Sequence, residues 1–262
     1  MTTVADILAF LNTVAPPYMK ESWDNVGLNV GYMGKEVKKI LVALDPFTHV
    51  CREARDMGAD LLVTHHVLIF RPGFVTDTTA QGKNTLFLIE NGIAHINAHT
   101  NLDQAPGGVN DVLAKTLGLE NVRVIAPKGT DDRGRAWGLL RGGEIKAQSL
   151  ADFLAVVKQK LGCECLRYVS GGRPVRKVAV GSGSCCDEMQ EALDAGCDTL
   201  VTGDAKYNDF WDAHDLGLNL IDAGHFYTEN PVVRYLAEKI AARFPEITVK
   251  ISESHQDCMK FY

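Results

Sequence analysis

The stretch EARDMGADLLVT at Glu53–Thr64 is repeated, with changes, as EALDAGCDTLVT at Glu191–Thr202. Eight of the twelve aligned positions are identical, at an offset of 138 residues. The same offset aligns VKKILVALD, which starts at Val37, with VRKVAVGSG, which starts at Val175. The chain therefore contains an internal duplication, and its two halves are expected to share one fold.

Each half carries the same series of apolar runs and helical patterns. In the first half, strands are predicted at Ile40–Leu44, Asp60–Thr64 and Ile93–Ala98, and helices at Pro46–Met57 and Thr85–Glu90. In the second half, strands are predicted at Val178–Val180, Asp198–Thr202 and Leu218–Ala223, and helices at Glu188–Ala195 and Phe210–Asp215. Strands that alternate with helices are typical of βαβ units. We therefore predict an α/β protein of two related lobes, residues 1–124 and about 125–262, with mostly parallel sheets.

Composition narrows the class of protein. The 262 residues are 46% hydrophobic and 23% charged, which excludes an intrinsically disordered chain. A chain with a net charge of −6 lacks the global basic field expected of a nucleic-acid binder, which leaves only a local basic patch open. No run reaches the about 18–20 apolar residues that cross a bilayer. The first residues read as a short amphipathic helix and not as a signal peptide. Seven cysteines without a C-x-x-C spacing predict free thiols and a cytoplasmic location.

Imidazoles and carboxylates follow the predicted strands at the points where the strands end. The first half contributes His65, His66, His99 and Asp103, and the second half contributes Asp204, His225 and Glu229. Ligands of open α/β sheets bind at the carboxyl ends of the strands, so these side chains are expected at one edge of the fold. A single histidine in such a position more often makes a structural hydrogen bond. The joint occurrence in both halves favours a metal site. The other histidines, His49, His95, His214 and His255, are interpreted as ordinary structural or surface residues.

The chemistry of this set predicts divalent cations. Nitrogen and oxygen donors without thiolate suit zinc, iron, manganese, nickel or cobalt. Adjacent His65 and His66 point to different sides of an extended chain, so each would hold one ion of a neighbouring pair. A carboxylate such as Asp103 or Glu229 can bridge or cap two ions. Two divalent ions carry more charge than two carboxylates neutralise, which favours a bound hydroxide and an anionic substrate.

Five sequence blocks closely resemble the GTP cyclohydrolase I type 2 family, whose members are also called NIF-three-like, dinuclear-metal hexameric proteins. The blocks are ESWDNVGLNVG from Glu21, LLVTHHVLIF from Leu61, NAHTNLDQAPGGVND from Asn97, VTGDAKYNDF from Val201 and IDAGHFYTE from Ile221. The resemblance runs over nearly the whole chain. It implies a NIF-three-like fold without the extra domain that some relatives insert between the halves, and a homohexamer.

The resemblance also implies roles for individual residues. It places the ligands of two divalent ions per subunit at His65, His66, Asp103, His225 and Glu229. It places His99 beside the ions, and His99 and Glu229 are therefore predicted to move the proton in catalysis. The chain departs from the family pattern at Val67, where proline is usual, and at Asn208, where histidine is frequent, and neither is a ligand.

Two functions from different classes follow. The first is a metal-dependent hydrolase that opens the guanine ring of GTP at C8 and releases formate. The second is a metal-binding regulatory or metal-handling protein with little catalysis. Phosphates of a nucleotide could meet Lys206 or the Gly107–Gly108 turn, and Trp23 could stack on a base that Asp24 or Asn25 hydrogen-bonds. The alternatives are a solvated lysine, a plain turn and an anchor for the N-terminal helix.

Overall fold

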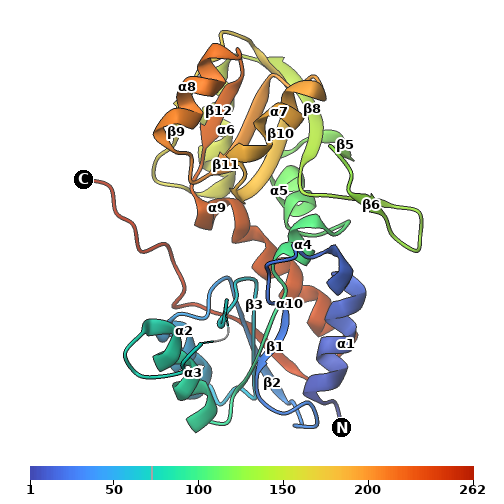
Figure 1. The fold of residues 1–262 in the computed structure, drawn as a ribbon, viewed down its shortest axis with the longest axis vertical. Helices are drawn as coiled ribbons and strands as arrows, with labels where there is room; N and C mark the ends of the chain where they lie inside the picture. The colour runs from blue at the N-terminus through green and yellow to red at the C-terminus, as the bar shows by residue number, and fades with distance from the viewer. Residues whose placement is uncertain (72) are drawn as a thin grey trace. The chain divides into compact units, whose positions relative to one another are not determined.

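The computed structural model describes residues 1–71 and 73–262. The described chain forms two compact units, which Figure 1 draws in ribbon form. The first unit comprises Met1–Leu102 and Val232–Gln256, and the second comprises Asp103–Pro231 and Asp257–Tyr262. The predicted limits of the lobes, residues 1–124 and 125–262, differ from these units. The chain enters the second unit about twenty residues earlier, and its last helix and strand return to the first unit.

The first unit is built on a five-stranded sheet with the strand order β1-β4-β3-β2-β13. Its strands are β1 (Gly27–Val30), β2 (Lys39–Ala43), β3 (Leu61–Thr64), β4 (Ala94–Asn97) and β13 (Thr248–Ile251). All neighbouring strands are parallel except β1 and β4, which are antiparallel. In register, Ala43 lies opposite Thr64, and Thr64 lies opposite Asn97. The carboxyl ends of β2, β3 and β4 therefore lie side by side.

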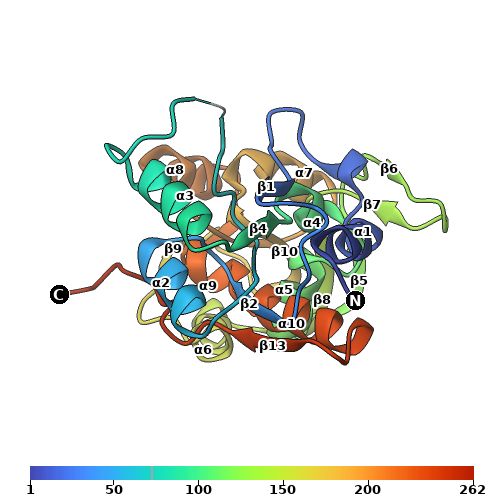
Figure 2. The same cartoon turned by 90° about the horizontal axis from the view of Figure 1, so that it is seen from below.

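Helices cover both faces of this sheet, as Figures 1 and 2 show. They are α1 (Val4–Val14), α2 (Thr48–Asp56), α3 (Ala80–Glu90) and α10 (Pro231–Arg243). On the face of α2 and α3, Leu41 and Leu62 pack in one buried cluster with Val50 and Leu88. Successive residues of a strand point to opposite faces, and Ile40, the neighbour of Leu41, is also fully buried. Burial on both faces explains why these strands read as continuous apolar runs.

The second unit is built on a six-stranded sheet with the strand order β5-β8-β10-β11-β12-β9. Its strands are β5 (Glu120–Val124), β8 (Arg141–Gln148), β9 (Arg167–Val169), β10 (Val175–Ser184), β11 (Thr199–Gly203) and β12 (Asn219–Asp222). The three central strands β10, β11 and β12 are parallel. The outer strands β5, β8 and β9 pair in antiparallel fashion. This sheet is thus mixed around a parallel centre.

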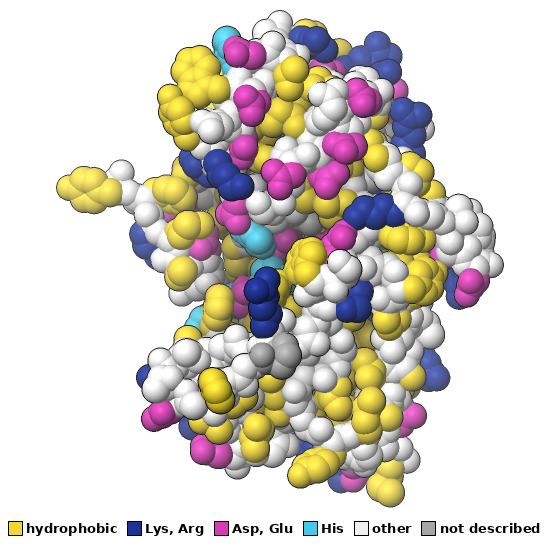
Figure 3. Space-filling view, in the orientation of Figure 1, with side chains coloured by type: hydrophobic (Ala, Val, Ile, Leu, Met, Phe, Trp, Pro, Cys, Tyr) yellow, Lys and Arg dark blue, Asp and Glu magenta, His cyan; other side chains and the backbone are white. Residues whose placement is uncertain are grey.

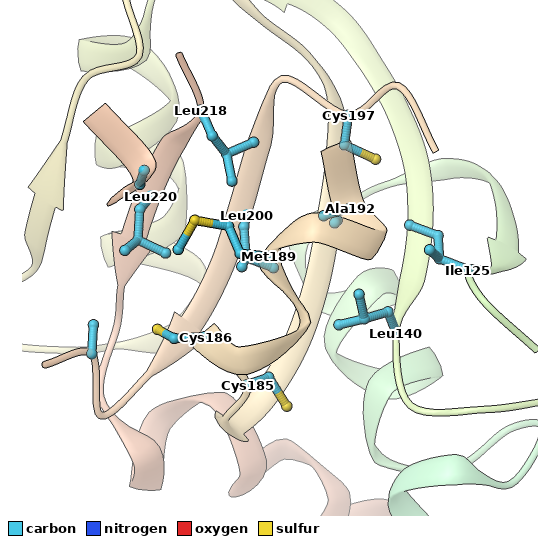
Figure 4. Packing of buried hydrophobic residues seen from close by; sticks show 13 residues of the cluster. Ile125, Leu140, Cys185, Cys186, Met189, Ala192, Cys197, Leu200, Leu218 and Leu220 are labelled. Carbon is cyan, nitrogen blue, oxygen red and sulfur yellow. The ribbon is translucent and has the colours of Figure 1, made fainter. Parts of the chain in front are cut away.

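Two buried hydrophobic clusters pack the second sheet against its helices. The helices are α5 (Val109–Leu117), α6 (Leu150–Leu161), α7 (Met189–Asp194) and α8 (Tyr207–Asp215). Ala179 and Leu200 belong to the cluster that contains Met189 of α7, which Figure 4 shows from close by. Val178 and Val201 belong to the cluster that contains Phe153 of α6. Complete burial of a leucine or phenylalanine side chain stabilises the fold by about 1.5–3 kcal/mol.

The two sheets confirm the internal duplication. Each sheet contains three neighbouring parallel strands in the order of the chain: β2, β3 and β4 in the first unit, and β10, β11 and β12 in the second. An antiparallel strand, β1 or β9, adds to the third strand in each unit. The α/β class and the predicted strands and helices of the repeat are therefore confirmed, with ends shifted by a few residues.

Short elements complete the described chain. They are η1 (Pro17–Met19), α4 (Thr100–Gln104), the hairpin β6 (Gly129–Thr130) and β7 (Ala136–Trp137), η2 (Cys186–Glu188) and α9 (His225–Glu229). Among the described helices, none has the length and apolar character needed to span a bilayer. The seven cysteines, all within the described part, are free thiols. In Figure 3 the acidic side chains are interspersed with lysine and arginine over the face shown, in keeping with the modest net charge.

Candidate metal centre

The first site segment is the turn that follows β3. His65 and His66 come directly after Thr64, the last residue of this strand. The Thr64 hydroxyl donates to the carbonyl oxygen of His66 at 2.6 Å. A hydroxyl has a single proton, and this one is donated to His66. In the 2.8 Å contact between His95 Nε2 and Thr64 Oγ1, the imidazole N–H of His95 therefore donates and the hydroxyl oxygen accepts. A buried chain of hydrogen bonds from β4 therefore fixes the turn that carries the histidine pair.

Three histidines of the first unit are held by their Nδ1 atoms. His65 Nδ1 lies 2.8 Å from the carbonyl oxygen of Ala98. His66 Nδ1 lies 2.5 Å from Asp45 Oδ1, and His99 Nδ1 lies 2.9 Å from Asp24 Oδ1. A carbonyl or an ionised carboxylate oxygen only accepts, so each Nδ1 carries the proton and donates it. When such a ring is neutral, its lone pair lies on Nε2, which is the arrangement of metal-binding histidines.

These three rings form one group, here called the imidazole cluster (His65, His66 and His99). One ring nitrogen of each lies within 4.8 Å of one from each of the others. The ring centroid of His65 is 4.9 Å from that of His66 and 5.3 Å from that of His99. His65 is fully buried, and the side chains of His66 and His99 are 19% and 15% exposed. Three convergent imidazoles with fixed tautomers suit a borderline divalent cation.

The two carboxylates behind the cluster are ionised. Burial favours the neutral form of Asp24, but hydrogen bonds from His99 and Thr100 outweigh it and lower the pKa to about 2. Burial acts in the same sense on Asp45, and hydrogen bonds from His255 and His66 hold its pKa well below the usual range. Each carboxylate therefore accepts from its imidazole as an anion, which strengthens the hydrogen bond and the basicity of Nε2.

The second unit contributes a group here called the carboxylate cluster (Asp103, His225 and Glu229). His225 is the first residue of α9 and Glu229 the last, so the two side chains lie one helical turn apart. His225 Nδ1 lies 2.7 Å from Asp204 Oδ2, and His225 Nε2 lies 3.1 Å from Glu229 Oε2. The carboxylate on Nδ1 again directs the second ring nitrogen toward the site.

Asp103 and Glu229 bring two carboxylates together in a buried place. Asp103 is 7% exposed, Glu229 is 4% exposed, and a carboxylate oxygen of one lies within 4.8 Å of one of the other. The side chain of Asn110 links the backbone of Asp103 to the end of β10. Its amide N–H donates to the carbonyl oxygen of Asp103, and its oxygen accepts from the backbone N–H of Ser182. Like charges this close and this buried are expected to hold a cation or a proton. The donor chemistry therefore fits a divalent ion.

Glycine is required where β10 passes this cluster. Gly183 has φ +64°, and a Cβ built on it would lie 2.3 Å from Glu229 Oε1. Its backbone N–H donates to Thr228 Oγ1 at 3.0 Å. The close approach of this strand leaves room for the Glu229 carboxylate only because position 183 has no side chain. Nearby, burial raises the pKa of the Cys185 thiol, and the charges of Asp103 and Glu229 raise it further. A neutral thiol is a poor metal ligand, in keeping with a nitrogen and oxygen site.

The structure thus brings together the predicted donors that share a unit, as the imidazole cluster and the carboxylate cluster. That the five predicted ligands share one pair of ions stays a prediction. Three supporting residues were not assigned these roles from the sequence: Asp24, Asp45 and His255. Asp45 lies two residues beyond the end of β2, so the rule on carboxyl ends of strands points to it as well. His255 lies far along the chain, and only the return of β13 to β2 brings it to Asp45.

The remaining sequence candidates are not members of either cluster. The backbone N–H of Gly107 donates to Asp111 Oδ2 at 2.7 Å, so a carboxylate of the chain already occupies this turn. Lys206 is an exposed residue directly before α8. Trp23 stacks on Phe70 with centroids 5.5 Å apart and planes at 26°, and it is 53% exposed. The edge contact of Trp23 with His99, at 6.2 Å between centroids, places this aromatic pair beside the imidazole cluster.

Known proteins of similar sequence and structure agree with this architecture. Residues 2–258 match the model of the family Duf34/NIF3 (NGG1p interacting factor 3). A Clostridium perfringens protein named GTP cyclohydrolase 1 type 2 homolog is 37% identical over 260 residues, which cover 98% of each chain. A Helicobacter pylori (strain J99) protein named GTP cyclohydrolase 1 type 2 is 31% identical over 244 residues, 91% of each chain.

Solved structures extend the agreement to the fold. The crystal structure of a Bacillus cereus protein related to NIF3 superposes with a TM-score of 0.93 at 26% identity, over 100% of this chain and 99% of that chain. The family model matches nearly all residues, and the C. perfringens relative is 37% identical over 98% of each chain. Proteins that share only a fold need not show either similarity. The chain therefore belongs to the Duf34/NIF3 family.

Proposed function

We propose that this protein is a dinuclear, divalent-metal-dependent hydrolase of the GTP cyclohydrolase type. The ligands of the two ions in the proposal are His65, His66, Asp103, His225 and Glu229, with zinc, iron, manganese, nickel or cobalt as candidate metals. One observation carries it: the three histidines among these ligands each have Nδ1 held by an oxygen atom, which is the arrangement in which Nε2 binds a metal. The names of the relatives from C. perfringens and H. pylori support the reaction type.

In the proposed hydrolysis, the metal ions and the residues around them would have different roles. Two bound divalent ions supply charge that lowers the pKa of water and polarises the substrate. His99 accepts a proton at Nε2, and the ionised Asp24 at its Nδ1 stabilises the positive ring that results. Glu229 is the second group for moving a proton. The exposed ring of Trp23 offers a stacking surface for the planar base, next to His99.

The reaction itself is tested with GTP. Protein loaded with one metal at a time is incubated with GTP, and pterin fluorescence and formate are followed together. The wild type is expected to release both products, and His65→Ala and Glu229→Gln are expected to abolish release. His214→Ala, in an exposed residue of the second unit, is the matched control. Turnover that survives both ligand substitutions would assign the activity to a contaminant.

The same experiment separates the second function. Tight metal binding without turnover on GTP or any other nucleotide would favour a regulatory or metal-handling protein. A homohexamer and a cytoplasmic location are part of the proposal. Light scattering on the metal-loaded protein tests the first, and fractionation of the cells that produce it tests the second.

A further inference from the structure

The segment that follows β13, Ser252–His255, is bound to α2 by a single carboxylate. Glu53 of α2 accepts hydrogen bonds from the hydroxyls of Ser252 and Ser254, both at 2.5 Å. It also accepts from the backbone N–H groups of Glu253 at 2.9 Å and Ser254 at 3.3 Å. Burial of Glu53 opposes ionisation, but these hydrogen bonds outweigh it and lower the pKa of the carboxyl. The C-terminal segment is therefore held in one place on the first unit.

The last residue of this segment reaches the support of the imidazole cluster. His255 Nε2 lies 2.9 Å from Asp45 Oδ2, and the His255 side chain is 5% exposed. The other oxygen of the same carboxylate, Oδ1, lies 2.5 Å from His66 Nδ1. Asp45 thus lies between two imidazoles and gives one oxygen to each. Phe47 lies edge-on to His255, with ring centroids 6.2 Å apart and ring planes at 79°.

We propose that His255 is a positioning residue for the metal ligand His66 and acts through Asp45. This inference rests on the proposed metal centre. A carboxylate with one fixed oxygen can still rotate about its Cβ–Cγ bond, whereas a carboxylate with both oxygens engaged cannot. The donor at Oδ2 therefore keeps Oδ1 on His66 Nδ1, and the proton on Nδ1 keeps the lone pair on Nε2. Partners of this kind outside the ligands typically change metal affinity about 10–100-fold.

A role in packing alone is the alternative, and two substitutions distinguish the roles. His255→Gln keeps a donor near the position of Nε2 and removes the ring. His255→Phe keeps the ring and removes the donor. If His255 only fills space, Phe is the milder change. If it orients Asp45, Gln is the milder change for metal binding, whatever each does to stability.

The test uses the full chain and Co²⁺ or Zn²⁺ as the probe. Affinity is measured by competition with a chromophoric chelator, and the visible spectrum of the Co²⁺ form reports the coordination sphere. We expect His255→Phe to weaken binding about tenfold and to shift the spectrum, and His255→Gln to stay close to the wild type. Glu53→Gln, which weakens the anchor without touching Asp45, is expected to fall between them. His214→Ala is the control histidine.

The outcomes separate the two proposals. If the wild type binds neither cation, the metal centre fails and this role of His255 fails with it. If the wild type binds and His255→Phe binds equally well, only the role of His255 is overturned. Long-range ¹H–¹⁵N spectra of the metal-free protein provide a second measurement, in which His66 should lose its single Nδ1–H tautomer in His255→Phe alone. An unchanged His66 tautomer in that variant would also overturn the inference.

Discussion

Asp24 has two carboxylate oxygens for four donors. They accept from His99 Nδ1 at 2.9 Å, from Asn25 N at 2.8 Å, from Thr100 N at 3.0 Å and from Thr100 Oγ1 at 2.5 Å. Asp24→Asn leaves one acceptor oxygen and sets an amide donor against these groups, so His99 loses its orientation and its counter-charge. We expect kcat for GTP to fall about 10²–10⁴-fold, with the affinity for Zn²⁺ nearly unchanged.

Kinetics and a chelator titration on the same samples check this. The control is Asp215→Asn, an exposed carboxylate of the second unit. Loss of kcat no greater than that of the control would remove His99 from the proposed mechanism.

His95 makes a prediction about pH. Complete burial lowers its pKa to about 3, against about 6.5 in an unfolded chain. Between pH 6.5 and 3, His95 therefore binds a proton in the unfolded state but not in the folded state. The stability that the neutral ring contributes is present above pH 6.5 and is lost as the pH falls from 6.5 toward 3. His95→Gln should flatten the acid limb of the stability curve by about 1.4 kcal/mol per pH unit in this range.

Urea unfolding of the wild type and of His95→Gln between pH 4 and 7 measures this slope difference. If the free energy of unfolding depended on pH in the same way in both proteins, the pKa of His95 would not be lowered by folding.

The strands of the repeat could be predicted from the sequence because both of their faces are buried. Leu61–Thr64 and Thr199–Gly203 are buried at every position and read as apolar runs. The outer strands give no such signal. β8 begins RGGE and is half exposed toward its end, and β13 is exposed at three of its four positions. Their pairing is decided by partners distant in sequence, which a local pattern does not report.

The turn at the end of β10 makes a prediction about one element. Gly183→Ala adds a Cβ at φ +64° and 2.3 Å from Glu229 Oε1. We expect a loss of about 1–3 kcal/mol of stability together with weaker metal binding, since the carboxylate must move. Gly172→Ala, at φ +73° with nothing within 4 Å, carries the backbone cost alone.

Thermal unfolding and Zn²⁺ titration compare the two variants. Equal metal affinities in both would mean that Gly183 does not make room for Glu229.

For the whole molecule, metal binding is expected to raise the melting temperature. A ligand that binds only the folded state at 100 times its Kd adds about 2.7 kcal/mol of stability. Removal of metal with a chelator should lower Tm in the wild type, and added Zn²⁺ or Mn²⁺ should restore it. His65→Ala and Glu229→Gln should show a reduced response in differential scanning fluorimetry. An equal response in all three proteins would place the bound ions elsewhere.

The candidate ligands could be identified from sequence because each directly follows a strand or lies within a turn of helix beyond it. His65 follows β3, and His225 and Glu229 begin and end the helix after β12. Their supports are of two kinds. Asp45 has the same signal as the ligands, since it lies just beyond β2. His255 has none, because its position depends on a strand pairing that joins Val249 to Ile40 across most of the chain.

The return of Val232–Gln256 to the first unit has a consequence for biosynthesis. A ribosome exposes almost the whole second unit before it exposes α10, β13 and His255, so the first unit can finish its sheet only after residues 103–231 have been translated. Chains cut short near residue 231 would carry both histidines of the pair on a nascent domain that lacks its edge strand. Translation as far as His255 would thus be required before the support of the imidazole cluster is complete.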